Sequence, residues 1–258
     1  MRDSPLLEER RGAVLILTLN RPERRNALSP ALFAQLLDAL VAADKDPGVR
    51  VVVITGNGSA FCSGMDLKAF SEGERPAPPD AANIYSFQGT KPLIAAVNGP
   101  AIAGGFEIAL ACDIVVASSN AFFALPEVKR GLIAGGGGIF KLTRLAGLGH
   151  AMRMLLTGDP ITAAAAHEAG VVAQVVEPGE ALEAALAIAE AVTKAAPHAV
   201  AETLAIARRS FDLDQPALWD LTAAAWARVV EGDEAREGAA AFLEKRDSIW
   251  PSIPVAKT

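Results

Sequence analysis

Residues 101–107, which read AIAGGFE, combine groups that could stabilise negative charge with an acid that could move a proton. The apolar run before them, residues 92–99, is typical of a buried parallel strand, and residues 106–112 are typical of a helix. A glycine pair therefore opens a helix beside a strand end, where free backbone N–H groups and the helix dipole favour an anion. Glu107 falls at this helix start, where the same dipole tolerates a carboxylate.

Similar groups follow two other expected strands. Gly64-Met65-Asp66 come after the second strand, and Glu127 comes after the fourth. Because the carboxyl ends of parallel strands meet at one edge of a sheet, we expect these groups and Glu107 to surround one cleft. Taken singly, the glycines could serve turns, Glu107 could be only a helix-terminal carboxylate, and Glu127 could be a solvated loop charge. Their expected convergence on one cleft favours a catalytic or binding site over separate structural roles.

The elements that position these groups follow from hydrophobic patterning. A serine followed by proline, Ser29-Pro30, is typical of a helix start, and an apolar stripe follows it, so the chain reads strand, helix, strand and predicts a parallel crossover. The expected strands cover residues 13–20, 49–55, 93–97, 113–118, 122–125 and 171–176. Further helices are expected over residues 81–88, 106–112, 139–145, 163–168, 181–195, 198–211, 217–230 and 234–245, with a mobile loop at 71–79.

Composition bounds the class of protein. The chain has 258 residues, about half of them apolar, which is enough for a full core, and its net charge of -6 argues against nonspecific binding to nucleic acid or to an anionic membrane. The two cysteines fit neither a metal site nor a disulfide framework. With no transmembrane-length apolar run and no signal-like segment, we expect a cytoplasmic protein. Helices after residue 197 carry apolar residues on more than one face, with Trp219 and Trp226 on the same side, so we expect a homo-oligomer.

Other candidate motifs favour structural roles. The run Gly135–Gly138 lacks the ending of a P-loop and the spacing of a dinucleotide fingerprint, which favours a tight turn with close helix packing. Cys62 has no histidine near it in its motif and is interpreted as a small packing residue rather than a nucleophile. The three histidines lie in helical segments away from the three loops and are interpreted as structural or exposed.

Three segments resemble the signatures of the enoyl-CoA hydratase/isomerase (crotonase) superfamily: AFCSGMDLK, NGPAIAGGFEIALACD and FFALPEVKRGL. The resemblance extends from LNRPERRNALS near the N-terminus to FLEKRDSIW near the C-terminus. It implies an α/β fold of the crotonase-like (ClpP/crotonase) class, a spiral of ββα units over residues 1–195 with a C-terminal helical trimerisation region over residues 196–258. It also implies a homotrimer or dimer of trimers that binds acyl-CoA thioesters and needs no metal or redox cofactor.

Carried onto this sequence, the resemblance assigns the backbone N–H groups of Met65 and Gly104 to an oxyanion hole for a thioester enolate. It places the segment from Met65 through Asp66 and Leu67 to Lys68 along coenzyme A, with Lys68 near phosphate. Arg24 and Arg25 are candidates for the same polyanion, although solvated loop charges explain them equally well. Residues 71–83, 131–138 and the C-terminal helices would form the acyl pocket. One departure is Ala103, which replaces the first glycine of the usual three.

Glu107 and Glu127 fall on the two glutamate positions of the family's hydratases. By resemblance, Glu107 would orient and deprotonate the water that adds to C3, and Glu127 would deliver or remove the proton at C2. Two carboxyls that share one water in an apolar cleft cannot both ionise readily, so one pKa should rise toward neutrality. The implied reaction is reversible syn addition of water to a 2-trans-enoyl-CoA.

Three alternatives stay open. One alternative is a Δ3,Δ2-enoyl-CoA isomerase, in which Glu127 alone would shuttle the proton, or another crotonase-type acyl-CoA enzyme. A non-catalytic paralogue would bind acyl-CoA without turnover. Without the resemblance, the residues indicate only an α/β domain with an anion site, which could bind a nucleotide.

Overall fold

The computed structural model describes residues 4–66, 71–73 and 83–250. Its main sheet has six strands in the order β1-β2-β3-β4-β6-β9, and every neighbouring pair is parallel except the β1-β2 hairpin. The strands are β1 (Leu6–Arg11), β2 (Val14–Leu19), β3 (Val51–Gly56), β4 (Leu93–Val97), β6 (Ile114–Ser118) and β9 (Gln174–Val176). The central strands β3 and β4 are almost wholly buried, which explains their continuous apolar runs.

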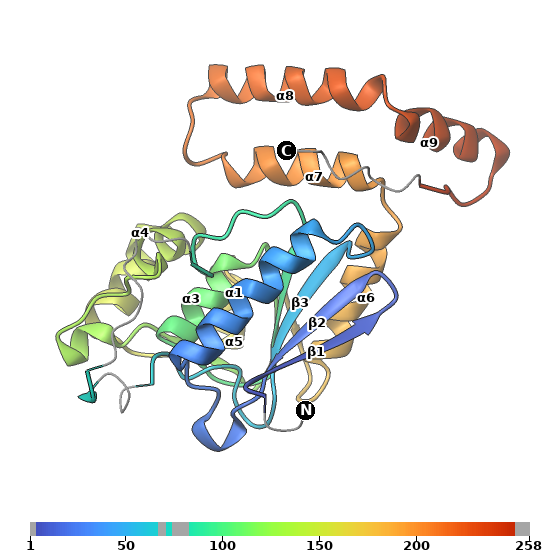
Figure 1. Ribbon diagram of the computed structural model, residues 1–258. Coiled ribbons are helices and arrows are strands. Elements are labelled where there is room, and N and C mark those ends of the chain that lie inside the picture. The colour runs from blue at the N-terminus through green and yellow to red at the C-terminus, as the bar shows by residue number, and fades with distance from the viewer. Residues whose placement is uncertain (1–3, 67–70, 74–82, 251–258) are drawn as a thin grey trace.

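Helices cover both faces of this sheet (Figure 1). Side chains of α1 (Pro30–Lys45) and α3 (Gly104–Ala111) share one apolar cluster with one face of the strands, and α6 (Ala181–Thr193) packs on the opposite face. α1 begins where the sequence predicts, because the Ser29 hydroxyl accepts a hydrogen bond from the backbone N–H of Leu32 at 3.3 Å. The helix that carries Glu107, α3, shares its apolar cluster with α1 and with one face of the sheet.

A smaller three-stranded sheet carries the strands that precede the two glutamate-bearing segments. It contains β5 (Ala101–Ile102), β7 (Phe122–Ala124) and β8 (Ile161–Thr162). β5 leads directly into α3, and β7 leads into the short 3-10 helix η2 (Glu127–Arg130). Glu127 therefore follows a strand of the smaller sheet, and the parallel pairing of β5 with β7 brings the two glutamate-bearing segments together.

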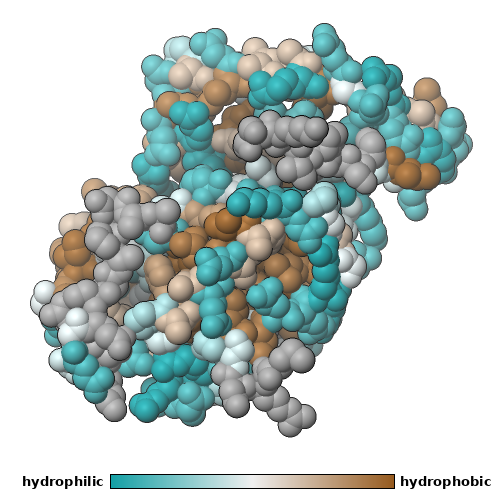
Figure 2. Space-filling view, in the orientation of Figure 1, coloured by the Kyte–Doolittle hydropathy of each residue, from teal (hydrophilic) through white to brown (hydrophobic). Residues whose placement is uncertain are grey.

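The chain continues with α4 (Gly138–Thr157), α5 (Ala163–Glu168), α7 (Pro197–Arg208), α8 (Gln215–Val230) and α9 (Asp233–Glu244). Figure 1 shows α7, α8 and α9 as a separate layer beyond the end of α6. Large apolar side chains of this layer are exposed, and Figure 2 shows apolar patches over α9 and on the α4 side of the molecule. Among the described residues, no helix has the length and apolar character needed to cross a membrane.

Several sequence expectations need correction. The helix expected over residues 81–88 is wrong for its described part: the chain makes a turn at residues 84–86, because Asn83 Oδ1 accepts hydrogen bonds from the backbone N–H groups of Tyr85 and Ser86. β1 was not expected, since most of its residues are charged and exposed. α4 continues far beyond residue 145, with a break from helical geometry at Gly147. Of the loop expected at 71–79, only residues 71–73 are described.

Candidate active site

Backbone contacts bring the loop after β3 against the start of α3. Cys62 pairs with Ala101, and Met65 pairs with Leu28, in two isolated parallel bridges. Gly64 lies at the closest approach: it has φ +84°, and a Cβ there would lie 2.7 Å from the Cβ of Ala103 and 3.1 Å from the amide nitrogen of Gly104. Only glycine fits between the two loops, so the motif is explained by close packing as well as by conformation.

Met65 and Gly104 expose the backbone donors that the sequence singles out. In the Leu28–Met65 bridge, Leu28 bonds to Gly64 and Asp66, so the Met65 N–H is not used for pairing. Within the described part of the chain, neither the Met65 nor the Gly104 amide donates a hydrogen bond to a protein acceptor. Two backbone donors in adjoining loops are therefore left unused by protein acceptors among the described residues, as an oxyanion hole would require.

Backbone strain marks the start of α3. Ala103 has φ 51° and ψ −127°, a conformation that costs a residue with a Cβ about 1–3 kcal/mol. A glycine would adopt it freely, which explains why the usual residue here is glycine. Gly105 cannot be replaced by a larger residue without a clash, because a Cβ there would lie 2.7 Å from the Cys62 side chain. Contacts on both sides hold the Gly104 amide in place.

Glu107 is the buried acid of the site. Its side chain is only 4% exposed, and its Oε1 accepts a hydrogen bond from the Gly138 amide at 2.9 Å. Burial, together with the negative charge of Glu127, raises the pKa of Glu107 to about 7, although hydrogen bonds from Gly138 and Gly136 oppose the shift. The carboxyl therefore exchanges protons near neutral pH, as a general acid or base must.

Glu127 lies at the start of η2 and is half-buried. Burial raises its pKa above the ordinary value. Its Oε2 is buried and has no hydrogen-bond partner among the described residues. A buried carboxylate oxygen without a partner costs free energy, so such an atom is expected where a substrate or water binds rather than where a side chain serves only the fold.

Tyr85, the chain's single tyrosine, also belongs to this site, and the sequence analysis missed it. A Cβ on Gly104 would lie 2.6 Å from the Tyr85 hydroxyl, and one on Gly136 would lie 2.7 Å from the Tyr85 ring. Burial raises the pKa of Tyr85 well above its usual value, and the charges of Glu107 and Glu127 raise it further. Tyr85 thus shares one environment with both acids. The helix predicted over residues 81–88 gave no indication of this position.

The glycine run at 135–138 packs closely, as expected, but its partner is the site itself. A Cβ on Gly136 would lie 2.8 Å from Glu107 Oε2, and Gly138 donates to the other oxygen of the same carboxyl. Spacing alone gave no signal of this, because the run is close to Glu107 only after α3 and α4 have packed together.

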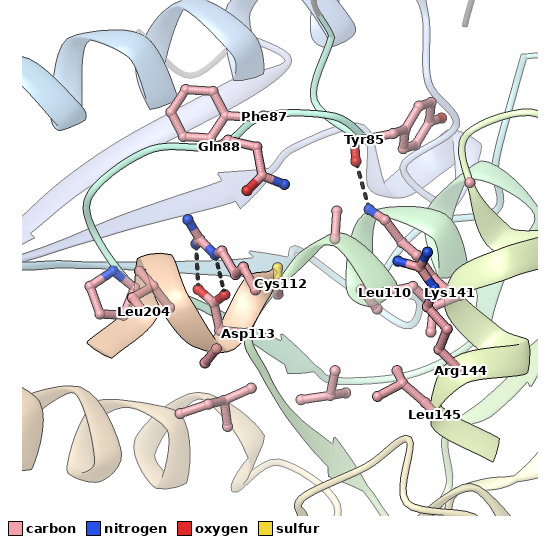
Figure 3. Close-up of a pocket in the computed structure, with 18 of the residues that line it drawn as sticks. Tyr85, Phe87, Gln88, Leu110, Cys112, Asp113, Lys141, Arg144, Leu145 and Leu204 are labelled. Atoms are coloured by element: carbon pink, nitrogen blue, oxygen red, sulfur yellow. Dashed lines mark hydrogen bonds and ion pairs between the residues drawn. The ribbon is translucent and has the colours of Figure 1, made fainter. Parts of the chain in front are cut away.

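A cavity of about 1070 Å³ adjoins this group of residues (Figure 3). Its walls come from the turn at 83–88, the C-terminal half of α3, the glycine run, α4 and α7. The walls are mainly apolar, and Tyr85 and Gly136 belong both to the cavity and to the surroundings of Glu107. A pocket of this size holds a substantial organic ligand.

Comparisons with known proteins agree with this geometry. Residues 9–252 match the family model for enoyl-CoA hydratase/isomerase. The chain belongs to the enoyl-CoA hydratase/isomerase family. A crystal structure of an enoyl-CoA hydratase from Mycobacterium tuberculosis H37Rv superposes with a TM-score of 0.93 at 42% identity, covering 97% of this chain and all (100%) of that one. The crotonase-like fold expected from the sequence is confirmed.

Relatives in the enoyl-CoA hydratase/isomerase family carry different names. An enoyl-CoA hydratase of Mycobacterium tuberculosis is 41% identical over 93% of this chain and 94% of its own length. A 2,3-dehydroadipyl-CoA hydratase of Escherichia coli is 40% identical over 94% and 97%, and a carnitinyl-CoA dehydratase of Salmonella typhimurium is 38% identical over 93% and 96%. The family thus supports an acyl-CoA hydro-lyase, whereas the acyl group differs among relatives.

Of the remaining predicted binding residues, Asp66 and Arg24 are described by the structure, whereas two others are not. Asp66 is half-buried and forms an ion pair with Arg21 at 3.2 Å, so it fixes the loop beside Met65. Arg24 is exposed in the 3-10 helix η1 (Pro22–Arg24), and its carbonyl accepts a hydrogen bond from the Ser63 hydroxyl. Leu67 and Lys68 lie outside the described residues.

Residues with expected structural roles are placed accordingly. Cys62 is fully buried, and burial raises the pKa of its thiol to about 12, which disfavours a thiolate nucleophile. His167 bonds through Nδ1 to the Val172 carbonyl, and His198 lies beside Glu202. The sequence missed Asn26, whose fully buried amide group bonds to three carbonyls of the loop after β3 and ties the N-terminal turn to it.

Proposed function

We propose that the protein is an enoyl-CoA hydratase that adds water reversibly, with syn geometry, to a 2-trans-enoyl-CoA. The observation that carries the proposal is the carboxyl pair beside two available amides. Glu107 has a pKa of about 7, and Glu127 has a buried oxygen without a protein partner among the described residues. A shared environment of two acids, with an anion-stabilising backbone next to them, supports proton transfer at adjacent carbons of a thioester.

The thioester oxygen would accept hydrogen bonds from the Met65 and Gly104 N–H groups. As water adds, negative charge develops on this oxygen in the enolate, and fixed backbone donors stabilise that charge without reorganisation. Removing one such donor typically raises a barrier by about 3 kcal/mol. Gly64 and Gly105 serve this step indirectly, because no larger residue would let the two loops approach.

In the hydration direction, Glu107 accepts a proton from water while the water oxygen forms a bond to C3. The C2–C3 π electrons move into the enolate, and Glu127 then donates a proton to C2 as the thioester carbonyl reforms. Dehydration reverses both transfers. Burial raises the pKa of both carboxyls, and that of Glu107 to about 7, which supports proton exchange between this pair and the substrate.

Coenzyme A would enter as part of the substrate, with no separate cofactor. Arg24 is exposed beside the Ser63 loop and could contact its phosphates, as could Lys68. The protein would act in the cytoplasm. We assign the exposed apolar layer to contacts with further copies in a homotrimer or dimer of trimers, because Trp219 and Trp226 are 66% and 69% exposed in one chain.

Purified protein should hydrate crotonyl-CoA or a longer 2-enoyl-CoA. The reaction can be measured as the loss of ultraviolet absorbance of the conjugated thioester. Glu107→Gln and Glu127→Gln should each lower kcat by about 10²–10⁴-fold. Wild-type rates in either variant would remove that carboxyl from the mechanism. Isomerisation of a 3-enoyl-CoA that survives Glu107→Gln but not Glu127→Gln would instead identify an isomerase. Binding of acyl-CoA without any turnover would identify a non-catalytic paralogue.

A further inference from the structure

Among the described residues, three cationic side chains line the cavity beside Glu107, and two of them are paired with carboxylates. Arg208 of α7 donates to both carboxylate oxygens of Asp113, at 2.7 and 2.8 Å, and to the Gly89 carbonyl. Arg144 of α4 forms an ion pair with Asp212 at 2.8 Å. The charges of these two arginines are therefore already compensated by protein carboxylates.

Lys141 is the third cation, and it is not compensated in this way. Its ammonium donates to the Tyr85 carbonyl at 2.6 Å, and among the described residues no carboxylate lies within ion-pair distance of it (Figure 3). An ammonium group has three N–H donors, so two are left for other acceptors. The side chain is half-buried, and desolvation lowers the pKa of Lys141 although the charges of Glu107 and Asp113 oppose that shift.

The position of Lys141 relates it to the proposed reaction. Tyr85 bridges the two places: its carbonyl accepts from Lys141, and its hydroxyl lies against Gly104. The positive charge of Lys141 also lowers the pKa of Glu107, which places the ammonium within electrostatic reach of that carboxyl. An acyl chain that left the oxyanion hole past Tyr85 would enter an apolar cavity with one uncompensated positive charge in its wall.

We infer that this cavity takes acyl chains whose distal end carries a carboxylate, and that Lys141 binds that carboxylate. The inference rests on the proposed function for the location of the thioester. A terminal carboxylate would supply the missing counter-charge and occupy the two remaining donors, whereas a terminal methyl would leave the ammonium partly desolvated and without an anion. Lys141 thereby determines which acyl-CoA the protein prefers.

Binding of saturated thioesters tests the inference without turnover. Isothermal titration would compare matched pairs of equal length: succinyl- with butyryl-CoA, adipoyl- with hexanoyl-CoA, and suberoyl- with octanoyl-CoA. For at least one pair, wild type should bind the carboxylate form about 10-fold or more tightly than the methyl form. Lys141→Met, which keeps an apolar stem, should abolish that preference, and Lys141→Arg should retain most of it.

Arg144→Met is the matched control, because it removes a cavity charge one helical turn away that is already paired. It should keep the preference for the carboxylate form. Because each readout is a ratio of two ligands on one protein, a general loss of affinity cancels. No carboxylate preference in any wild-type pair, or the same preference in Lys141→Met, would overturn the inference.

Turnover separates this inference from the proposed function. Hydration of crotonyl-CoA by wild type, together with equal binding of carboxylate and methyl thioesters, would leave the hydratase proposal standing and reject the role of Lys141. A Lys141-dependent carboxylate preference without hydration of any enoyl-CoA would support the carboxylate site and reject the hydratase proposal.

Discussion

Replacing Glu107 by glutamine should stabilise the fold while it removes activity. Glu107 is 4% exposed, and burial raises the pKa of its carboxyl from 4.5 to about 7. A raised pKa in an acid means that the folded state holds the proton more tightly than the unfolded state, so folding loses stability as pH rises from 4.5 to 7. At pH 8, where the carboxyl is ionised in both states, this difference in pKa corresponds to about 3 kcal/mol of destabilisation.

Glutamine cannot ionise, so it removes the cost of a buried charge, and it keeps one of the two hydrogen bonds that the carboxylate accepts. Its Oε1 can still accept from Gly138, whereas its NH₂ cannot accept from the Gly136 amide, a loss of about 1 kcal/mol. We therefore expect Glu107→Gln to be about 2 kcal/mol more stable than wild type at pH 8 and about equally stable at pH 5, where wild-type Glu107 is protonated in the folded state.

Urea denaturation at pH 5 and pH 8, at one protein concentration, measures both quantities. Glu183→Gln is a suitable control, because Glu183 is also a first-turn glutamate but its side chain is 72% exposed. The control should change stability little at either pH. If the stability difference between Glu107→Gln and wild type did not grow by about 2 kcal/mol from pH 5 to pH 8, Glu107 would not be a buried acid with a raised pKa, and the reasoning would fail.

Two other substitutions test how the site and the assembly are built. Gly136→Ala places a methyl 2.7 Å from the Tyr85 ring and 2.8 Å from Glu107 Oε2, so kcat should fall at least about 10-fold in steady-state hydration. Gly149→Ala, with no atom within 4 Å of the added carbon, should leave activity unchanged. Replacing Trp219 and Trp226 together by glutamate should lower the mass measured by light scattering to that of a single chain, and an unchanged mass would exclude these residues from the subunit contact.

The sequence by itself determined the elements whose patterns are local. Continuous apolar runs identified the central parallel strands, and Ser29-Pro30 located the start of α1. The glycine pair that opens α3 and the family signatures around Glu107 and Glu127 were likewise identified from local sequence patterns. These features are readable because strand burial, helix capping and glycine conformation depend on neighbouring residues.

Only the tertiary structure decided which distant residues share the site. Tyr85 lies in a turn set by the Asn83 side chain, and the glycine run lies against Glu107 only because α3 and α4 pack together. Likewise, the lack of an anionic partner for Lys141 can be recognised only after Arg208 and Arg144 have found theirs, within the described residues. The sequence predicts that the pKa of one carboxyl rises toward neutrality, but only the packing assigns a pKa of about 7 to Glu107, because desolvation depends on the groups that surround the carboxyl in the fold.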